Sequence, residues 1–198
     1  MMRIGAICAG YGGLELAVMR ALPEAELFWY AEKAKAPAQI MAYHWPDIPN
    51  LGDITVVDWA KVPRVDVISG GTPCQDLSKA GKRHGMAAGT RSNLWVSMRE
   101  AIATMRPSLV IWENVHGAYT AKATSDLEYC QGCMGDRSGV YLRALSRVVG
   151  DLASLGYDSA WGNLRASDIG APHQRRRTFL CATIADPQPL PHEKHGDT

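Results

Sequence analysis

Cys74 is the side chain of this sequence best placed for covalent chemistry. It ends the glycine-rich loop 69–74, which follows directly on the apolar run at residues 65–68. Ligands of open α/β sheets bind outside the carboxyl ends of the strands, and glycines there let a substrate approach the backbone. A cysteine at such a position is a candidate nucleophile. The alternative is that Cys74 is a small apolar residue, the commoner role of a free cysteine.

Two further sets of polar residues accompany Cys74. Glu113 ends the apolar run that begins at residue 109, so its carboxyl group reaches the same edge of a parallel sheet as Cys74. Arg175 and Arg177 come directly before the apolar run 178–183, and guanidinium groups clamp a phosphate or a carbonyl oxygen. The alternative for an arginine run is a solvated face.

The glycine-rich loop at residues 9–13 indicates a bound nucleoside, because backbone amides at a helix start can approach a ligand closely. The loop is not a complete dinucleotide fingerprint, and a tight turn is the alternative. Glu32 follows about 20 residues later, where dinucleotide folds place the group that binds ribose hydroxyls. Asp53 supplies a carboxylate at the next junction between a strand and a loop, and this group is suited to bind an adenine amino group. Ordinary surface carboxylates are the alternative for both acids.

Strand-like and helix-like patterns alternate along the chain and predict how these residues meet. Expected strands cover residues 3–9, 27–31, 65–69, 109–113, 157–163 and 178–183. Expected helices cover residues 14–21, 36–44, 93–105 and 141–155. This order predicts an α/β fold with a doubly wound, mostly parallel sheet.

Length and composition favour one soluble domain. The 198 residues suit a single core, which we place at residues 1–184 with a loop insertion at 120–139 and an irregular tail at 185–198. The net charge of +1 excludes a protein that coats polyanions over its whole surface. Five cysteines, no leader that resembles a signal peptide and only short apolar runs predict a cytoplasmic protein without a membrane partner.

Taken in chain order, these segments resemble the motifs of the cytosine-C5 DNA methyltransferases. The loop 9–13 resembles the first motif of that family, Glu32 the second, and residues 52–54 the third. Pro73-Cys74-Gln75 resembles the nucleophile motif, and Glu113-Asn114-Val115 resembles the acid motif.

The resemblance continues to about Thr183. Residues 89–94 are similar to the segment between the nucleophile and acid motifs. His173, Arg175 and Arg177 fall on the family's glutamine-x-arginine-x-arginine pattern, with histidine in place of the glutamine. The order of so many elements identifies the sequence as similar to this family over nearly its whole length.

The resemblance implies the Rossmann-like fold of S-adenosylmethionine-dependent methyltransferases and S-adenosylmethionine as cofactor. The positions that match its cofactor motifs are Ala9, Gly10, Gly12, Gly13, Glu32, Asp53, Ile54 and Pro73. It also implies double-stranded DNA as partner, in a restriction-modification or phage setting.

The chemistry implied by the resemblance is methyl transfer to cytosine. The Cys74 thiolate adds to carbon 6 of the base, which makes carbon 5 nucleophilic. Glu113 holds or protonates ring nitrogen 3, and Arg175 and Arg177 support the carbonyl oxygen and the flanking phosphate. The target base is flipped out of the duplex, and the basic stretch 79–91 is expected to close over it.

The sequence departs from the family pattern in ways that affect both substrates. It contains no segment similar to the target-recognition domain or to the last two motifs, so we expect a truncated enzyme or a second chain that supplies them. Cys8 and Thr72 each stand where the family has phenylalanine. A module that binds DNA or a partner without catalysis is the main alternative. A nicotinamide-dependent oxidoreductase is a weaker one, because it leaves Cys74 and Glu113 without roles.

Cys130 and Cys133 have the spacing of half a structural zinc site. His116, Asp126 or Glu128 could complete it, but a second such cysteine pair is absent from the sequence. We therefore expect reduced thiols and no metal at this position.

Overall fold

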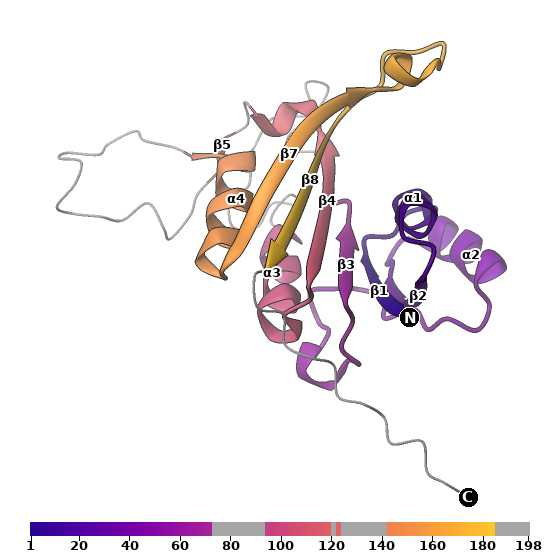
Figure 1. Cartoon of the computed structure of the whole chain (residues 1–198). Helices are drawn as coiled ribbons and strands as arrows, with labels where there is room; N and C mark the ends of the chain where they lie inside the picture. The colour runs from indigo at the N-terminus through magenta and orange to yellow at the C-terminus, as the bar shows by residue number, and fades with distance from the viewer. Residues whose placement is uncertain (73–93, 120–121, 124–141, 185–198) are drawn as a thin grey trace, which may run out of the picture.

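The structure is a computed structural model that describes residues 1–72, 94–119, 122–123 and 142–184. Within these residues one sheet has the strand order β2-β1-β3-β4-β8-β7 (Figure 1). Its strands are β1 (Met2–Ile7), β2 (Ala25–Ala31), β3 (Val67–Gly70), β4 (Leu109–Val115), β7 (Tyr157–Arg165) and β8 (Arg176–Ile184). A small second sheet pairs β5 (Lys122–Ala123) with β6 (Leu142–Arg143).

The helices alternate with these strands. They are α1 (Gly13–Ala21), α2 (Lys35–His44), α3 (Leu94–Met105) and α4 (Ala144–Ser154). Short 3-10 turns are η1 (Trp59–Lys61), η3 (His116–Tyr119) and η5 (Ala166–Ile169). The small sheet and the 3-10 turns are too short for the periodicity of the sequence to predict.

The strand directions confirm the predicted α/β sheet. β2, β1, β3 and β4 run parallel, and β8 is antiparallel to both of its neighbours, β4 and β7. β7 therefore runs in the same direction as the first four strands, which makes the sheet mixed but mostly parallel. Each predicted strand and helix is present, and the largest difference in a boundary is the helix expected from residue 141, which begins at Ala144.

One face of the sheet is covered by α1 and α2. Side chains alternate between the two faces along a strand, and Ile4 and Ala6 of β1 lie on this face together with Leu27 of β2. Val18 of α1 and Met41 of α2 pack in the same buried cluster. Figure 1 shows both helices on the side of β1 and β2.

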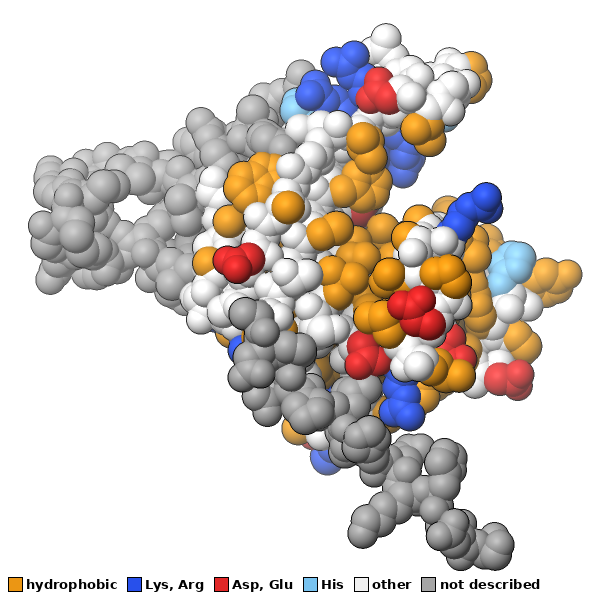
Figure 2. All heavy atoms as spheres, in the orientation of Figure 1, with side chains coloured by type: hydrophobic (Ala, Val, Ile, Leu, Met, Phe, Trp, Pro, Cys, Tyr) orange, Lys and Arg blue, Asp and Glu red, His pale blue; other side chains and the backbone are white. Residues whose placement is uncertain are grey.

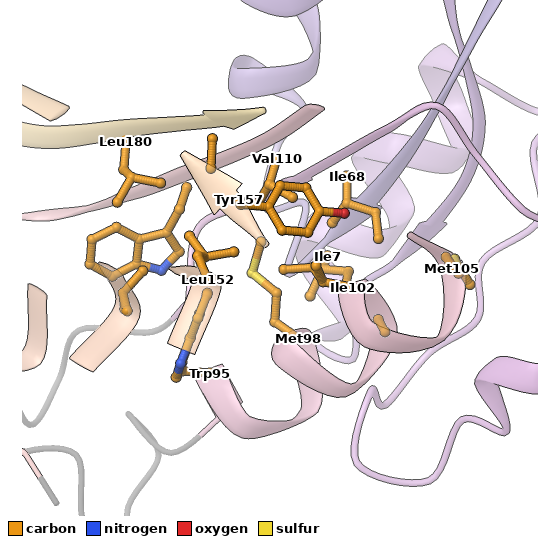
Figure 3. Packing of buried hydrophobic residues seen from close by; sticks show 14 of the residues in the cluster. Ile7, Ile68, Trp95, Met98, Ile102, Met105, Val110, Leu152, Tyr157 and Leu180 are labelled. Atoms are coloured by element: carbon orange, nitrogen blue, oxygen red, sulfur yellow. The ribbon is translucent and has the colours of Figure 1, made fainter. Parts of the chain in front are cut away.

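The opposite face is covered by α3 and α4, which makes the fold doubly wound. The packing is visible in Figure 3, where side chains from both helices meet side chains from the strands. The fully or nearly fully buried members of this cluster include Ile7, Ile68, Trp95, Met98, Ile102, Val110, Leu152 and Leu180. The Trp95 indole also donates a hydrogen bond of 2.7 Å to Asp151 of α4, which satisfies the polar end of a buried ring.

Gly5 permits close packing between β1 and β2. A Cβ atom at this position would lie 2.2 Å from the Trp29 ring, a distance that no side chain tolerates. The Trp29 indole in turn donates to the carbonyl oxygen of Pro63 at 3.0 Å. The strand register shifts between Ile4 and Gly5, where the large ring is accommodated.

Glu15 connects α1 to the sheet through a buried hydrogen bond. Its side chain is 1% exposed, and the Ser69 hydroxyl of β3 donates to its Oε1 atom at 2.6 Å. The Oε2 atom has no hydrogen-bond partner among the described residues. Burial raises the pKa of this carboxyl group above its ordinary value, against the smaller opposing effect of the Ser69 hydrogen bond.

We expect Glu15 to make stability depend on pH. The raised pKa means that the folded state holds the Glu15 proton more tightly than the unfolded state. The free energy of unfolding should therefore be highest below the ordinary pKa of 4.5 and fall as the pH rises through the folded pKa. One such proton contributes at most about 1.4 kcal/mol per pH unit. Urea unfolding across this pH range should show that Glu15→Gln lacks this slope, and equal slopes in both proteins would contradict the prediction.

Candidate active site

A pocket of about 730 Å³ lies beside the ends of β1 and β2. Three of the predicted nucleoside-binding residues, Glu32, Asp53 and Ile54, are among its lining residues. The remaining lining residues are Cys8, Ala31, Lys33, Ala34, Gly52, Thr55, Gly71 and Leu94. The pocket therefore joins the end of the first two strands to the loop that begins after β3.

The glycine-rich loop forms the turn between β1 and α1. Gly10 has φ 57° and Gly12 has φ 79°, the left-handed conformation that glycine adopts without strain. A Cβ atom at Gly12 would also lie 2.7 Å from the Trp45 ring. Ala9 is buried ahead of this turn, and Gly13 is the first residue of α1.

Glu32 holds this loop against the end of β2. Its Oε2 atom accepts a hydrogen bond from the Gly10 amide at 2.9 Å, and its Oε1 atom accepts one from the Ala34 amide at 2.7 Å. A carboxylate oxygen has capacity for a second donor, so both oxygens retain an acceptor site. These two hydrogen bonds shape the pocket, and the Glu32 carboxylate can still accept a hydrogen bond from a hydroxyl group.

Asn50, which the sequence analysis missed, binds two residues of the pocket lining, Glu32 and Gly52. Its Oδ1 atom accepts hydrogen bonds from the amides of Glu32 at 3.0 Å and Gly52 at 2.9 Å, and its amide group donates to the Glu32 carbonyl oxygen at 3.1 Å. These bonds fix the chain on both sides of the pocket. The available signal was an asparagine two residues before a glycine, a pattern typical of a side-chain turn.

Asp53 is held as a carboxylate by three donors. The amide and hydroxyl of Thr55 donate to its Oδ1 atom at 3.1 and 2.8 Å, and the Lys33 ammonium lies 2.6 Å from its Oδ2 atom. The hydrogen bond from Lys33 is the largest of the effects that lower the pKa of Asp53 to about 2. Asp53 therefore lines the pocket as an ionised carboxylate.

Cys8 lines the pocket as a neutral thiol. It has φ 53°, which turns the chain directly after β1. Burial, followed by the negative charges of Glu32 and Asp53, raises the pKa of the Cys8 thiol to about 12. Because the nucleophile is the thiolate, Cys8 is unsuited to covalent catalysis.

Glu113 and Arg177 form an ion pair on adjacent strands. The Arg177 Nε atom lies 2.8 Å from the Glu113 Oε1 atom. Val115 is opposite Arg177 in the antiparallel β4–β8 register, so Glu113 is its diagonal neighbour on the same face. Burial raises the pKa of Glu113, and the charges of Arg177 and then Arg175 oppose this rise. The structure thus brings together two predicted site residues, an acidic and a basic side chain, from distant parts of the sequence.

Gly71 passes close to the Glu113 carboxyl group. A Cβ atom at Gly71 would lie 3.3 Å from Glu113 Oε2, which is closer than most side-chain contacts. Gly71 also lines the nucleoside pocket. The segment that leads to the predicted nucleophile thus borders both the pocket and the acid.

Thr72 anchors this segment to β4. Its side chain is 3% exposed, and its hydroxyl oxygen accepts hydrogen bonds from the Trp112 indole at 3.0 Å and the Asn114 amide at 3.2 Å. The Asn114 amide also donates to the Thr72 carbonyl oxygen at 3.2 Å. The sequence analysis treated Thr72 only as the replacement of an aromatic ring, and these bonds give it a structural role of its own.

Several predicted residues lie outside the described part of the chain. These are Pro73, Cys74, most of residues 89–94, the stretch 79–91, Cys130, Cys133 and the tail 185–198. His173 and Arg175 are described and exposed, and the Arg175 amide donates to the His173 ring at 3.4 Å.

The described residues contain no group of three or more side chains suited to hold a metal ion. Within the same residues, no helix combines the length and the apolar character needed to span a membrane.

Comparison with known proteins identifies relatives over nearly the whole chain. A family model described as C-5 cytosine-specific DNA methylase matches residues 2–197. The type II methyltransferase M.NgoBV of Neisseria gonorrhoeae is 28% identical over 181 residues, which are 91% of this chain and 40% of that protein. A DNA N-6-adenine-methyltransferase of Escherichia phage P1 is 27% identical over 205 residues, covering 85% of this chain and 27% of that protein. The chain thus spans less than half the length of these relatives.

Solved structures share the fold. The Dnmt2 methyltransferase of S. pombe superposes with a TM-score of 0.69 at 15% identity, covering 96% of this chain and 53% of that one. The match confirms the Rossmann-like methyltransferase fold that the order of the motifs predicted.

Removing the Thr72 hydroxyl should destabilise the fold. In Thr72→Val the Trp112 indole loses its acceptor in a buried site, which costs about 1–3 kcal/mol. Thr72→Ser keeps the hydroxyl and should recover much of this loss. Thr183→Val, on an exposed position of β8, is the matched control and should change stability by less than about 0.5 kcal/mol. Urea unfolding checks the series, and equal effects of the two valine variants would refute the role of the hydroxyl.

Removing the Arg177 charge should raise the pKa of Glu113. Burial raises the pKa of Glu113, and the charge of Arg177 is the largest of the effects that lower it. Arg177→Gln removes this charge, so the pKa should rise further. Arg175→Gln should raise the pKa less, and Arg20→Gln, at the far end of α1, should leave it unchanged. Carbon NMR titration of the Glu113 carboxyl measures each value, and an unchanged or lower pKa in Arg177→Gln would contradict the ion pair.

Proposed function

Because this chain belongs to the C-5 cytosine-specific DNA methylase family, we propose that it is the catalytic domain of a DNA cytosine-5 methyltransferase. The reaction is transfer of a methyl group from S-adenosylmethionine to carbon 5 of a cytosine in double-stranded DNA. We assign residues 1–184 to this domain. The observation that carries the proposal is the Glu113–Arg177 pair beside Gly71, three residues before Cys74.

The pocket fits the adenosine part of S-adenosylmethionine. Glu32 has free acceptor capacity for ribose hydroxyls, and Asp53 is an ionised acceptor suited to an adenine amino group. The residues proposed to hold the cofactor are Ala9, Gly10, Gly12, Gly13, Glu32, Asp53, Ile54 and Pro73. When bound, the cofactor supplies an electrophilic methyl group.

Cys74 is the proposed nucleophile. Its thiolate attacks carbon 6 of the flipped cytosine, which places electron density on carbon 5 and lets that atom take the methyl group. A solvent base then takes the carbon 5 proton, the C5–H electron pair re-forms the C5–C6 double bond, and the C6–S bond breaks to release the thiolate. Cys74 is thus the nucleophile of the addition and the leaving group of the elimination.

Glu113 is the proposed acid that stabilises this adduct. Burial raises the pKa of Glu113, which favours its protonated form, and a protonated carboxyl group can donate a hydrogen bond to ring nitrogen 3. Arg177 holds the other oxygen of the group and so fixes its orientation. Arg175, exposed next to this pair, is suited to a flanking phosphate.

A second chain that carries target recognition and the family's last motifs is part of the proposal. Support comes from apolar side chains of β7 and β8 that the described elements leave exposed. Leu164 of β7 is 55% exposed, and Cys181 of β8, which the register places on the same face, is also exposed. Figure 2 shows hydrophobic side chains gathered in the hollow between these strands and α1. We place this enzyme in the cytoplasm of a bacterium or of a phage-infected host.

Covalent trapping on DNA that contains 5-fluorocytosine tests the mechanism. The fluorine blocks the elimination step, so the wild-type chain with S-adenosylmethionine should form an adduct with the DNA. Cys74→Ala should form none, and Cys181→Ala, which removes an exposed cysteine of β8, should react like the wild type. The experiment is run with the chain alone and with the product of any adjacent reading frame that carries the missing motifs.

Three outcomes separate the alternatives. An adduct that depends on Cys74, together with 5-methylcytosine in ordinary DNA, supports the proposal. DNA binding without an adduct in either arrangement would instead assign the chain to a binding module. N6-methyladenine as the only product would overturn cytosine methylation in favour of the base that the phage P1 relative is named for.

A further inference from the structure

The β7–β8 hairpin carries basic side chains beyond the end of β4. Val115, the last residue of β4, is opposite Arg177, so the next pair toward the tip, Arg165 and Arg176, has no neighbour on β4. Figure 1 shows that this hairpin extends past the other strands, and Figure 2 shows basic side chains at its end. Residues 165–177 contain four arginines and one aspartate. The hairpin end is therefore strongly basic, although the net charge of the whole chain is only +1.

Arg165 and Arg176 are like charges directly opposite each other. The β7–β8 register pairs these two residues, and directly opposite side chains lie on one face with Cβ atoms about 4.5–5.5 Å apart. Like charges in such a pair destabilise a sheet. Side chains alternate along a strand, so Arg177, which binds Glu113, points to the other face. The Arg165–Arg176 pair is thus a feature separate from the Glu113–Arg177 ion pair.

No acidic side chain relieves this repulsion within the described residues. Neither Arg165 nor Arg176 forms an ion pair there. The Arg176 Nε atom is buried without a hydrogen-bond partner in the same part of the chain. Asp168, the acid of the hairpin tip, accepts a hydrogen bond of 2.8 Å from the Arg165 backbone amide and not from its guanidinium group. The pair therefore carries positive charge that no described carboxylate compensates.

An anion between the two guanidinium groups would turn this repulsion into attraction. Phosphate oxygens accept the N–H groups of arginine in a fork geometry, and such charge-assisted hydrogen bonds are roughly twice as strong as neutral ones. The DNA backbone carries one phosphate per nucleotide. A phosphodiester group thus has the charge and the acceptors that the pair lacks.

We propose that Arg165 and Arg176 form a clamp that holds one phosphate group of the DNA backbone at the end of the β7–β8 hairpin. The inference rests on the proposed function, in which DNA is the substrate, and adds a contact outside the residues assigned to catalysis. Arg176 is next in sequence to Arg177, so a duplex that delivers its flipped cytosine to Glu113 passes its backbone along this hairpin. Phosphate contacts fix position and do not read bases, so the clamp contributes affinity and orientation but no sequence selection.

DNA binding by charge variants tests the clamp. Arg165→Gln and Arg176→Gln should each bind a fluorescein-labelled DNA duplex roughly tenfold more weakly than the wild type in about 50 mM salt. The slope of log affinity against log salt should become shallower by about one in the double variant, because one phosphate contact is lost. Both arginines hold the same phosphate, so the loss in the double variant should be smaller than the product of the two single losses. Arg20→Gln, at the exposed end of α1, is the matched control and should bind like the wild type.

Urea unfolding without DNA tests the like-charge pair itself. Arg165→Glu places opposite charges across the pair, so it should raise the urea midpoint at low salt. The same variant should weaken DNA binding at least as much as Arg165→Gln. An equal or lower midpoint in Arg165→Glu would mean that the two arginines do not repel each other, which overturns the clamp.

Duplexes that carry a single uncharged methylphosphonate, at a different position in each, identify the phosphate. One position should weaken binding by the wild type and leave binding by the double variant unchanged. If every position weakens both proteins equally, the pair holds no backbone phosphate and the clamp is overturned.

The outcomes also separate the clamp from the proposed function. DNA binding that Arg165→Gln and Arg176→Gln leave unchanged would overturn the clamp and leave the proposed function intact. Losses that multiply in the double variant would mean two independent contacts and would overturn the shared site. If the wild type binds no DNA duplex at low salt, DNA fails as the substrate and the clamp fails with it.

Discussion

Parallel pairing of β1, β3 and β4 is the constraint on which the candidate site depends. The register places Ile7 beside Gly70 and Gly70 beside Trp112, so β1 and β3 both end at the level of Trp112 in β4. The next residues are Cys8, Gly71 and Glu113, each of which borders the pocket or the acid. A slip by one residue would turn every side chain of a strand to the other face and separate these groups. The two apolar layers prevent such a slip, because each strand buries different residues on each side.

Hydrogen bonds then fix the loops that the sheet brings together. Glu32 holds the turn after β1, and Thr72 holds the segment after β3 to the buried end of β4. Each bond joins residues more than 20 positions apart, and each satisfies a polar group that burial would otherwise penalise. Loops of this kind are positioned by a rigid scaffold, which is the usual arrangement at functional sites. Contacts within the folded sheet therefore set the geometry of the pocket.

The sequence predicted the elements well because each has a strong local pattern. Helices such as α3 and strands such as β4 repeat their apolar residues with the period of their type, and the site residues stand at the ends of strands. The contacts between distant residues were not predictable in this way. No local pattern indicates that Thr72 accepts from Trp112, that Lys33 pairs with Asp53, or that Asn50 bonds the Glu32 backbone. These pairings depend on the three-dimensional register, which alternation of apolar residues constrains without specifying each partner. The role of Cys74 rests on the sequence and on the position of Gly71.

Two acids at this edge of the sheet have pKa values shifted in opposite directions, and this difference follows from their surroundings. Asp53 is near solvent with a lysine and two Thr55 donors, so its pKa is depressed and it can only accept hydrogen bonds. Glu113 is more buried, and burial outweighs Arg177 and Arg175, so its pKa is raised and its protonated form can donate. A nucleoside amino group needs an acceptor, whereas a ring nitrogen that gains electron density needs a donor. One edge of the sheet thus holds an acid that can only accept and an acid that can donate once it is protonated, and the difference in burial separates their pKa values.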